Sequence, residues 1–341
     1  MNRPMDGQEP RLEQTVLDEL EARRIRLRQV RTLGGGRNSR VMLLEGQDRS
    51  FVLKSYPRFR DDQRDRMGTE VRMLGFLHRH GVRQVPEPLF WCREGNWSVF
   101  TLLKGETITA VTPRLLEGVG QFLGRLKEAG ENSREAEALP IASEACFSVE
   151  ALQVMLAGRL NRLDAMRGRG SVQDAAYTWS SRWLKDDHLR LTARLKTQGQ
   201  DTAVMTCMAP EERVLSPSDV GIHNMLQMEN GLGFLDFEYA GWDDPAKFAA
   251  DWILQPDNPL RLEQALQLVA AVRRGIGEGS WQERLPIVLE FNRLKWCAIM
   301  LNMFLREHGE SAQDALSRQL ERTQSYFHDS MVLMSGFREA Y

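Results

Sequence analysis

The pattern of apolar and polar positions divides the chain into a short strand-rich part and a longer helical part. An apolar stripe at helical spacing predicts an amphipathic helix over residues 11–24, and a second stripe predicts a helix that ends near His80. Between them, residues 30–56 read as β-strands, with breaks at Gly34–Gly36 and at a polar turn. A further strand is expected around residues 97–103.

Helical spacing dominates the second part of the chain. It runs from Thr112 to Ala203 and resumes at Pro245, with a loop and a hairpin between the two stretches. We therefore expect an α+β fold with two regions, residues 1–104 and residues 105–341, and a boundary near Lys104–Gly105.

Composition narrows the possible functions. The 341 residues include 45 Lys and Arg against 47 Asp and Glu, so the net charge of −2 gives no electrostatic reason to expect a nucleic-acid partner. Four scattered cysteines suit a reducing compartment, and the first residues contain no apolar signal segment. Three charged residues interrupt the apolar stretch at 285–305, so no membrane span is expected. The sequence predicts a cytoplasmic protein without membrane or nucleic-acid partners and leaves its oligomeric state open.

A cluster of polar residues surrounds a predicted hairpin. Asp219 and Asn224 precede the dipeptide Asn230-Gly231, which favours a two-residue type I′ turn, and Asp236 follows it. Such a turn would place Asn224 opposite Phe237 and make Asn224 and Asp236 diagonal neighbours. Because neighbouring strands lie about 5 Å apart, an amide oxygen and a carboxylate there could share one hard cation such as magnesium.

Asp219 lies five residues before Asn224, on a loop that contains Pro217. This position lets its carboxylate hold a hydroxyl nucleophile in line with a phosphate. The alternative is structural, because Asp219 could cap a turn and Asn224 could satisfy backbone groups. The hairpin between the polar residues favours the catalytic interpretation.

A glycine-rich segment in the strand-rich part suggests a phosphate site. Gly34, Gly35 and Gly36 lie between two strand-like runs, where backbone N–H groups can approach phosphate oxygens closely. The segment is not a Walker A motif, because the Gly-Lys-Ser/Thr sequence is absent. A simple hairpin turn is the alternative.

Lys54 lies among apolar residues on one face of its predicted strand, and a lysine in that setting needs an anionic partner. Glu70 is the candidate partner, because it borders the apolar stripe of Met67, Val71 and Leu74 on the following helix. Simpler alternatives exist: Lys54 could be an edge-strand lysine in water, and Glu70 a solvated glutamate.

The order Asp-x-x-x-x-Asn, hairpin, apolar-Asp-Phe-Glu is similar to the aminoglycoside phosphotransferase and choline kinase superfamily. The resemblance implies a two-lobed protein-kinase-like fold, with a small β-rich amino-terminal lobe and a large helical carboxy-terminal lobe. It implies that Asp219 is the catalytic base or orienting residue, and that Asn224 and Asp236 bind magnesium. Asp-Phe-Glu-Tyr at 236–239 looks especially like the segment of choline and ethanolamine kinases.

Other positions take their expected roles from the same resemblance. A Lys54–Glu70 pair would orient the α- and β-phosphates of ATP. Backbone at Thr101 and Leu103, in the inter-lobe hinge, would bind adenine. The last aspartate of Asp244-Pro245…Asp251 corresponds to a family residue that braces the catalytic loop.

The chain departs from the family pattern at Pro217-Ser218-Asp219, where His-Gly-Asp is usual. The expected activity is ATP- and magnesium-dependent transfer of the γ-phosphoryl group to a hydroxyl of a sugar, amino sugar or choline-like alcohol. Glu238 is a possible further acidic contact, and His223 is expected to pack or hydrogen-bond in the loop. An antibiotic-modifying kinase and a nucleotide-binding pseudokinase remain alternatives. A protein kinase is disfavoured, because the Arg before the catalytic Asp and the Asp-Phe-Gly form are both absent.

Overall fold

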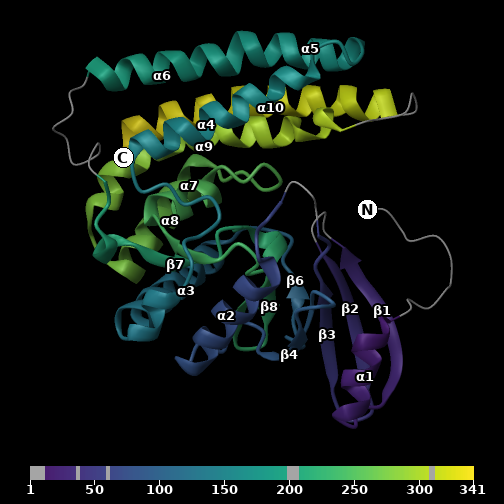
Figure 1. Cartoon of the computed structure of the whole chain (residues 1–341). Helices are drawn as coiled ribbons and strands as arrows, with labels where there is room; N and C mark the ends of the chain where they lie inside the picture. The colour runs from purple at the N-terminus through teal and green to yellow at the C-terminus, as the bar shows by residue number, and fades with distance from the viewer. Residues whose placement is uncertain (1–11, 36–38, 59–61, 198–206, 307–311) are drawn as a thin grey trace.

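The computed structural model describes residues 12–35, 39–58, 62–197, 207–306 and 312–341. Its amino-terminal region contains a five-stranded antiparallel sheet in the order β1-β2-β3-β5-β4 (Figure 1). The strands are Leu27–Gly35 (β1), Arg40–Gly46 (β2), Ser50–Ser55 (β3), Pro88–Cys92 (β4) and Trp97–Thr101 (β5). The sequence pattern predicts all of these strands except β4.

Two helices accompany the sheet, and both are predicted by the apolar stripes. Helix α1 (Gln14–Ala22) packs on the sheet through a small core of buried apolar residues that includes Val16, Leu20 and Trp97. The buried face of helix α2 (Arg66–Arg79) belongs instead to the larger core that continues through the helical part. Helix α2 therefore ties the sheet to the rest of the molecule.

The carboxy-terminal region is mainly helical. In Figure 1, α5 and α6 lie along one edge of the molecule. Helices α4, α9 and α10 form the next layer, and α7 and α8 lie on the other side of that layer. A π-helical turn, Ser181–Lys185, joins α5 to α6. The helices are α3 (Pro113–Glu131), α4 (Val149–Arg162), α5 (Ser171–Ser180), α6 (Asp186–Thr197), α7 (Pro245–Ile253), α8 (Leu262–Ile276), α9 (Ser280–Met300) and α10 (Gln313–Ala340).

Two small sheets lie among these helices. Strands β6, β8 and β9 form one antiparallel sheet, and β7 pairs with β10 in the other. The loop at 217–224 connects β7 to β8, and the segment at 235–240 connects β9 to β10. The strands are Glu106–Thr107 (β6), Val214–Ser216 (β7), Met225–Met228 (β8), Gly231–Phe234 (β9) and Gly241–Asp243 (β10).

The turn of the β8–β9 hairpin differs from the predicted one. Met228 pairs with Gly231, so the two turn residues are Glu229 and Asn230. A type I′ turn needs a positive φ at both central residues. Neither Glu229 nor Asn230 has one, whereas Gly231 takes φ 118° directly after the turn. The glycine therefore serves the hairpin one position later than expected.

This register also changes the neighbours of Asn224. Its carbonyl oxygen accepts the backbone N–H of Leu235 at 2.8 Å, so Asn224 lies opposite Leu235 and not opposite Phe237. Asp236 comes directly after Leu235 and lies beyond the ladder of β8 and β9. Both polar residues therefore still lie at the open end of the hairpin, one on each side of it.

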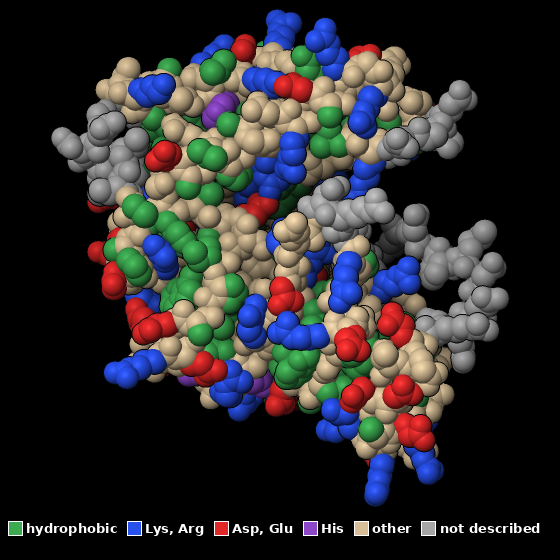
Figure 2. Space-filling view, viewed as in Figure 1, with side chains coloured by type: hydrophobic (Ala, Val, Ile, Leu, Met, Phe, Trp, Pro, Cys, Tyr) green, Lys and Arg blue, Asp and Glu red, His purple; other side chains and the backbone are tan. Residues whose placement is uncertain are grey.

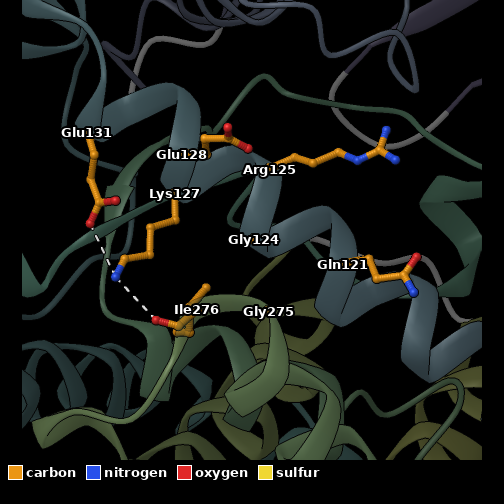
Figure 3. A pocket seen from close by; sticks show the side chains of 8 residues that line it. All are labelled: Gln121, Gly124, Arg125, Lys127, Glu128, Glu131, Gly275 and Ile276. Atoms are coloured by element: carbon orange, nitrogen blue, oxygen red, sulfur yellow. Dashed lines mark hydrogen bonds and ion pairs between the residues drawn. The ribbon is translucent and has the colours of Figure 1, made fainter.

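Helices α3 and α8 cross at close range. A Cβ on Gly275 would lie 2.0 Å from the carbonyl oxygen of Gly120, so the crossing requires glycine there. Beside the crossing, a shallow pocket of about 530 Å³ is lined by residues of both helices (Figure 3). In this pocket Lys127 Nζ donates to the carbonyl oxygen of Ile276 at 3.2 Å, which caps the end of α8.

The surface agrees with the composition. Lys and Arg side chains are interspersed with Asp and Glu over the face seen in Figure 2. Among the helices described, none combines the length and the apolar character needed to cross a bilayer.

Candidate functional site

Lys54 lies at the centre of a cluster of charged side chains. It is on β3, and its Nζ is 2.7 Å from Glu70 Oε2, 2.6 Å from Asp236 Oδ1 and 3.4 Å from Glu238 Oε2. The Lys54 side chain is only 7% exposed. The structure thus places Lys54 against Glu70, the partner inferred from the sequence. It adds two carboxylates from the segment after β9.

Among the described residues of this cluster, three carboxylates surround one ammonium group. Burial alone would lower the pKa of Lys54, but Glu70, Asp236 and Glu238 together raise it above its usual value. Burial raises the pKa of Glu238. One oxygen of each carboxylate lies within 4.8 Å of the others. The excess of negative charge suits a divalent cation, which prefers oxygen ligands.

The glycine-rich segment is in register with Lys54 across the sheet. Gly34 pairs with Val41 on β2, and Val41 pairs with Lys54 on β3. Two strand spacings, roughly 10 Å, therefore separate the backbone at Gly34 from that at Lys54. Gly35 ends β1, whereas Gly36 is outside the described residues. This register brings the end of β1 and Lys54 to the same end of the sheet.

Thr101 and Leu103 lie where the chain leaves the sheet. Thr101 ends β5, and its backbone N–H donates to the carbonyl oxygen of Glu87 at 2.9 Å. Leu103 follows and is half-buried. Because the N–H of Thr101 is engaged, an adenine ring would have to use other backbone groups of this segment.

The loop between β7 and β8 brings Asp219 and Asn224 into contact. The side-chain nitrogen of Asn224 donates to the backbone oxygen of Asp219 at 3.2 Å. That bond leaves the amide oxygen of Asn224, the atom that can bind a cation, for another partner. The backbone N–H of Leu235 donates to the carbonyl oxygen of Asn224, so these two hydrogen bonds connect Asp219 with the segment that carries Asp236.

Two residues of this region have an unusual backbone conformation. One directly precedes the predicted catalytic residue, and the other is a predicted metal ligand. Ser218, directly before Asp219, has φ 69°, and Asp236 has φ 63°. Among the other described non-glycine residues, positive φ occurs only at Arg24 and Asn96. This region is costly for residues with a Cβ and is common at functional sites, where the surrounding structure maintains it.

His223 lies beside the catalytic candidate. Its Nε2 is 3.6 Å from Asp219 Oδ1. Burial would lower the pKa of His223, but Asp219 raises it above its usual value. The sequence predicts only packing or hydrogen bonding for His223, and the contact identifies Asp219 as the neighbour.

A second ion network lies beneath the loop. Lys247 Nζ is 3.0 Å from Asp243 Oδ2, 2.9 Å from Asp251 Oδ2 and 3.5 Å from Ser218 Oγ. Lys295 adds a contact to Asp251 at 2.6 Å. All four charged side chains are buried. Asp251 therefore reaches the loop through Lys247. Lys247 is not among the residues predicted from the sequence, although the i,i+4 spacing of Asp243, Lys247 and Asp251 is a signal for it.

Solved structures of small-molecule kinases share this fold. A spectinomycin phosphotransferase in complex with ADP and spectinomycin gives a TM-score of 0.61 at 11% identity, covering 95% of this chain and 99% of its own. A choline kinase from Cryptosporidium parvum gives 0.59 at 9% identity, with coverages of 95% and 92%. An amicoumacin kinase in complex with AMP-PNP and Ca²⁺ gives 0.59 at 15% identity, with coverages of 93% and 96%. The fold is the two-lobed protein-kinase-like fold implied by the sequence.

Sequence comparison gives the family. No curated protein sequence matches the chain. A family model described as the phosphotransferase enzyme family matches residues 29–247, more than half of the 341 residues. The match extends over every candidate residue from Gly34 to Asp236. The chain therefore belongs to the phosphotransferase enzyme family.

Proposed function

We propose that this chain transfers the γ-phosphoryl group of ATP to a hydroxyl group of a small molecule, with magnesium as a cofactor. The observation that carries the proposal is one continuous set of contacts. Lys54 contacts Asp236, the residue before Asp236 pairs with Asn224 at the end of the hairpin, and Asn224 donates to Asp219. Family membership supports phosphoryl transfer, and similar structures that hold ADP or AMP-PNP support a nucleotide donor.

The strand-rich region would bind the nucleotide. Lys54, held by Glu70, would bind oxygens of the α- and β-phosphates. Backbone N–H groups of the glycine-rich segment, Gly34–Gly36, would cover the phosphates, in keeping with the pairing of Gly34 and Lys54 through β2. The hinge from Thr101 to Leu103 would contact the adenine.

Asn224 and Asp236 would hold magnesium, with Glu238 as a further acidic contact. The surplus of carboxylates around Lys54 supports this assignment. When bound, the cation would neutralise charge on the phosphates during transfer.

Asp219 would orient the acceptor hydroxyl and accept its proton. The hydroxyl oxygen then forms a bond to the γ-phosphorus, and the bond from that phosphorus to the β,γ-bridging oxygen breaks, so ADP leaves with the electron pair. The altered Pro217-Ser218-Asp219 loop is supported from below by Lys247. This support favours an active enzyme over a pseudokinase.

ATP consumption with pooled alcohols tests the proposal. The pools are sugars, amino sugars, choline-like alcohols and aminoglycosides, each measured with and without magnesium. We expect a metabolite pool to stimulate ATP consumption only when magnesium is present. Asp219→Ala should retain nucleotide binding and lose about 10²–10⁴ in rate.

The possible outcomes separate the alternatives. Nucleotide binding without consumption in any pool would indicate a nucleotide-binding scaffold. Stimulation by aminoglycosides alone would indicate an antibiotic-modifying kinase. Full activity of Asp219→Ala would overturn the role given to that residue.

A further inference from the structure

Tyr56, just after β3, places its phenol beside the Lys54–Glu70 pair. Its hydroxyl oxygen lies 2.7 Å from Glu70 Oε2 and 3.0 Å from Ser98 Oγ. Tyr56 is 3% exposed and Ser98 is fully buried. Lys54 Nζ contacts the same Glu70 oxygen at 2.7 Å. The phenol and the ammonium group therefore share one carboxylate oxygen.

Charge fixes the direction of these hydrogen bonds. Glu70 is ion-paired with Lys54 and, as a carboxylate, can only accept, so the Tyr56 hydroxyl donates to it. A phenol has one hydrogen to donate, so the Ser98 hydroxyl donates to Tyr56. The resulting chain runs from Ser98 through Tyr56 to Glu70. Each bond in such a buried chain strengthens the next.

The second oxygen of Glu70 reaches the segment that carries the metal candidate. The backbone N–H of Phe237 donates to Glu70 Oε1 at 3.1 Å. Asp236 directly precedes this peptide and has the strained φ of 63°. Two contacts thus hold Asp236, one from Lys54 to its side chain and one from Glu70 to the following peptide.

A neutral donor suits this position better than another cation would. A second ammonium group beside Glu70 would compete with magnesium for Asp236 and Glu238. The Tyr56 hydroxyl instead fixes Glu70 and adds no charge. A side chain that only filled space would need no hydroxyl here, since an unbonded buried hydroxyl is destabilising.

We propose that Tyr56 is a positioning residue of the magnesium–nucleotide site. Its hydroxyl fixes the Glu70 carboxylate, and Glu70 in turn holds Lys54 and the peptide after Asp236. The inference rests on the proposed function and extends it to a residue that touches neither substrate nor metal. Loss of the hydroxyl should weaken binding of ATP with magnesium more than binding of ATP alone, because Asp236 loses support.

Tyr56→Phe tests this inference, because it removes one oxygen and keeps the ring. Calorimetric titration with ATP, once with magnesium and once with EDTA, gives the ratio of the two affinities. We expect the affinity with magnesium to fall about tenfold, the effect of one hydrogen bond to a charged group. The affinity in EDTA should change less.

Tyr326→Phe is the matched control. The Tyr326 hydroxyl, on α10, is also buried, and it donates to the backbone oxygen of Leu254 at 2.7 Å and not to a side chain of the Lys54 cluster. This variant should be less stable to heat but keep the wild-type ratio of affinities. Ser98→Ala removes the donor to Tyr56 and should shift the ratio in the same direction by a smaller factor. It supplies the test if Tyr56→Phe does not fold.

The result can fail in two distinguishable ways. A magnesium-dependent wild type whose ratio of affinities is unchanged in Tyr56→Phe and in Ser98→Ala would overturn the role of Tyr56 alone. A wild type that binds ATP equally well with magnesium and with EDTA would overturn the proposed cofactor, and the inference with it.

Discussion

Lys54 Nζ lies 2.6 Å from Asp236 Oδ1, although 182 positions separate the two residues in the chain. The contact joins β3 to the segment that follows β9. Each residue neutralises part of the charge that the other brings into the cluster. Lys54 is the proposed phosphate ligand and Asp236 a proposed metal ligand. Replacing either residue should therefore weaken nucleotide binding, the step that precedes phosphoryl transfer.

Asp236→Ala should abolish magnesium-dependent nucleotide binding, because it removes the acidic ligand that the hairpin places beside Lys54. The measurement is the thermal shift produced by ATP with and without magnesium. Asp329→Ala, which removes an exposed carboxylate on α10, is the control and should keep the wild-type shift. Equal magnesium-dependent shifts in wild type and Asp236→Ala would refute the assignment.

Lys247→Met should destabilise the protein by about 3–5 kcal/mol, because it leaves the buried Asp243 and Asp251 without their shared ammonium group. Equilibrium unfolding in denaturant measures the loss. Asp251 keeps its ion pair with Lys295, so the double variant Lys247→Met/Asp243→Asn removes the charge left uncompensated at Asp243 and should recover part of the stability. If the free energy of unfolding of Lys247→Met lies within about 1 kcal/mol of the wild-type value, which is the range of exposed ion pairs, the network contributes little to stability.

Local pattern accounts for the part of the site that the sequence predicts. A lysine among apolar residues on a strand needs a buried anion, and a glutamate at the border of the next helical stripe supplies it. The spacing of Asp219, Asn224 and Asp236 likewise follows from one loop and one hairpin. The division of the chain at residues 104 and 105 and the roles of these residues stay predictions.

Long-range contacts account for what the sequence does not predict. The backbone N–H of Phe234 donates to the carbonyl oxygen of Gln84 at 2.8 Å, and β8 pairs with β6 as well as with β9. These contacts with distant parts of the chain occur together with the observed hairpin register, which the Asn230-Gly231 dipeptide alone does not predict. Lys295 reaches Asp251 across 44 positions, so no local period indicates it.

Asp62→Asn should lower stability at neutral pH and matter progressively less in acid. Hydrogen bonds from Arg64 and Arg66 hold the pKa of the Asp62 carboxyl well below its usual range. A depressed folded-state pKa stabilises the protein above the unfolded value, about 4, and that stabilisation is lost as the pH falls further. Thermal unfolding of wild type and variant should differ by a constant amount from pH 7 to about 5 and converge below about 4. A difference independent of pH down to the acid limit of folding would contradict the ion pairing.

Gly275→Ala and Gly158→Ala should change stability in opposite directions, although both replace a helical glycine by alanine. A Cβ at Gly275 would lie 2.0 Å from the backbone oxygen of Gly120, so α3 and α8 would have to separate. We expect a loss of at least about 1–3 kcal/mol, the usual cost of overpacking. A Cβ at Gly158, in α4, meets nothing within 4 Å, so the higher helix propensity of alanine should stabilise the protein by about 0.5–1 kcal/mol. Denaturant unfolding of the two variants measures both effects. Equal stabilisation of both would show that α3 and α8 do not pack at the distance described.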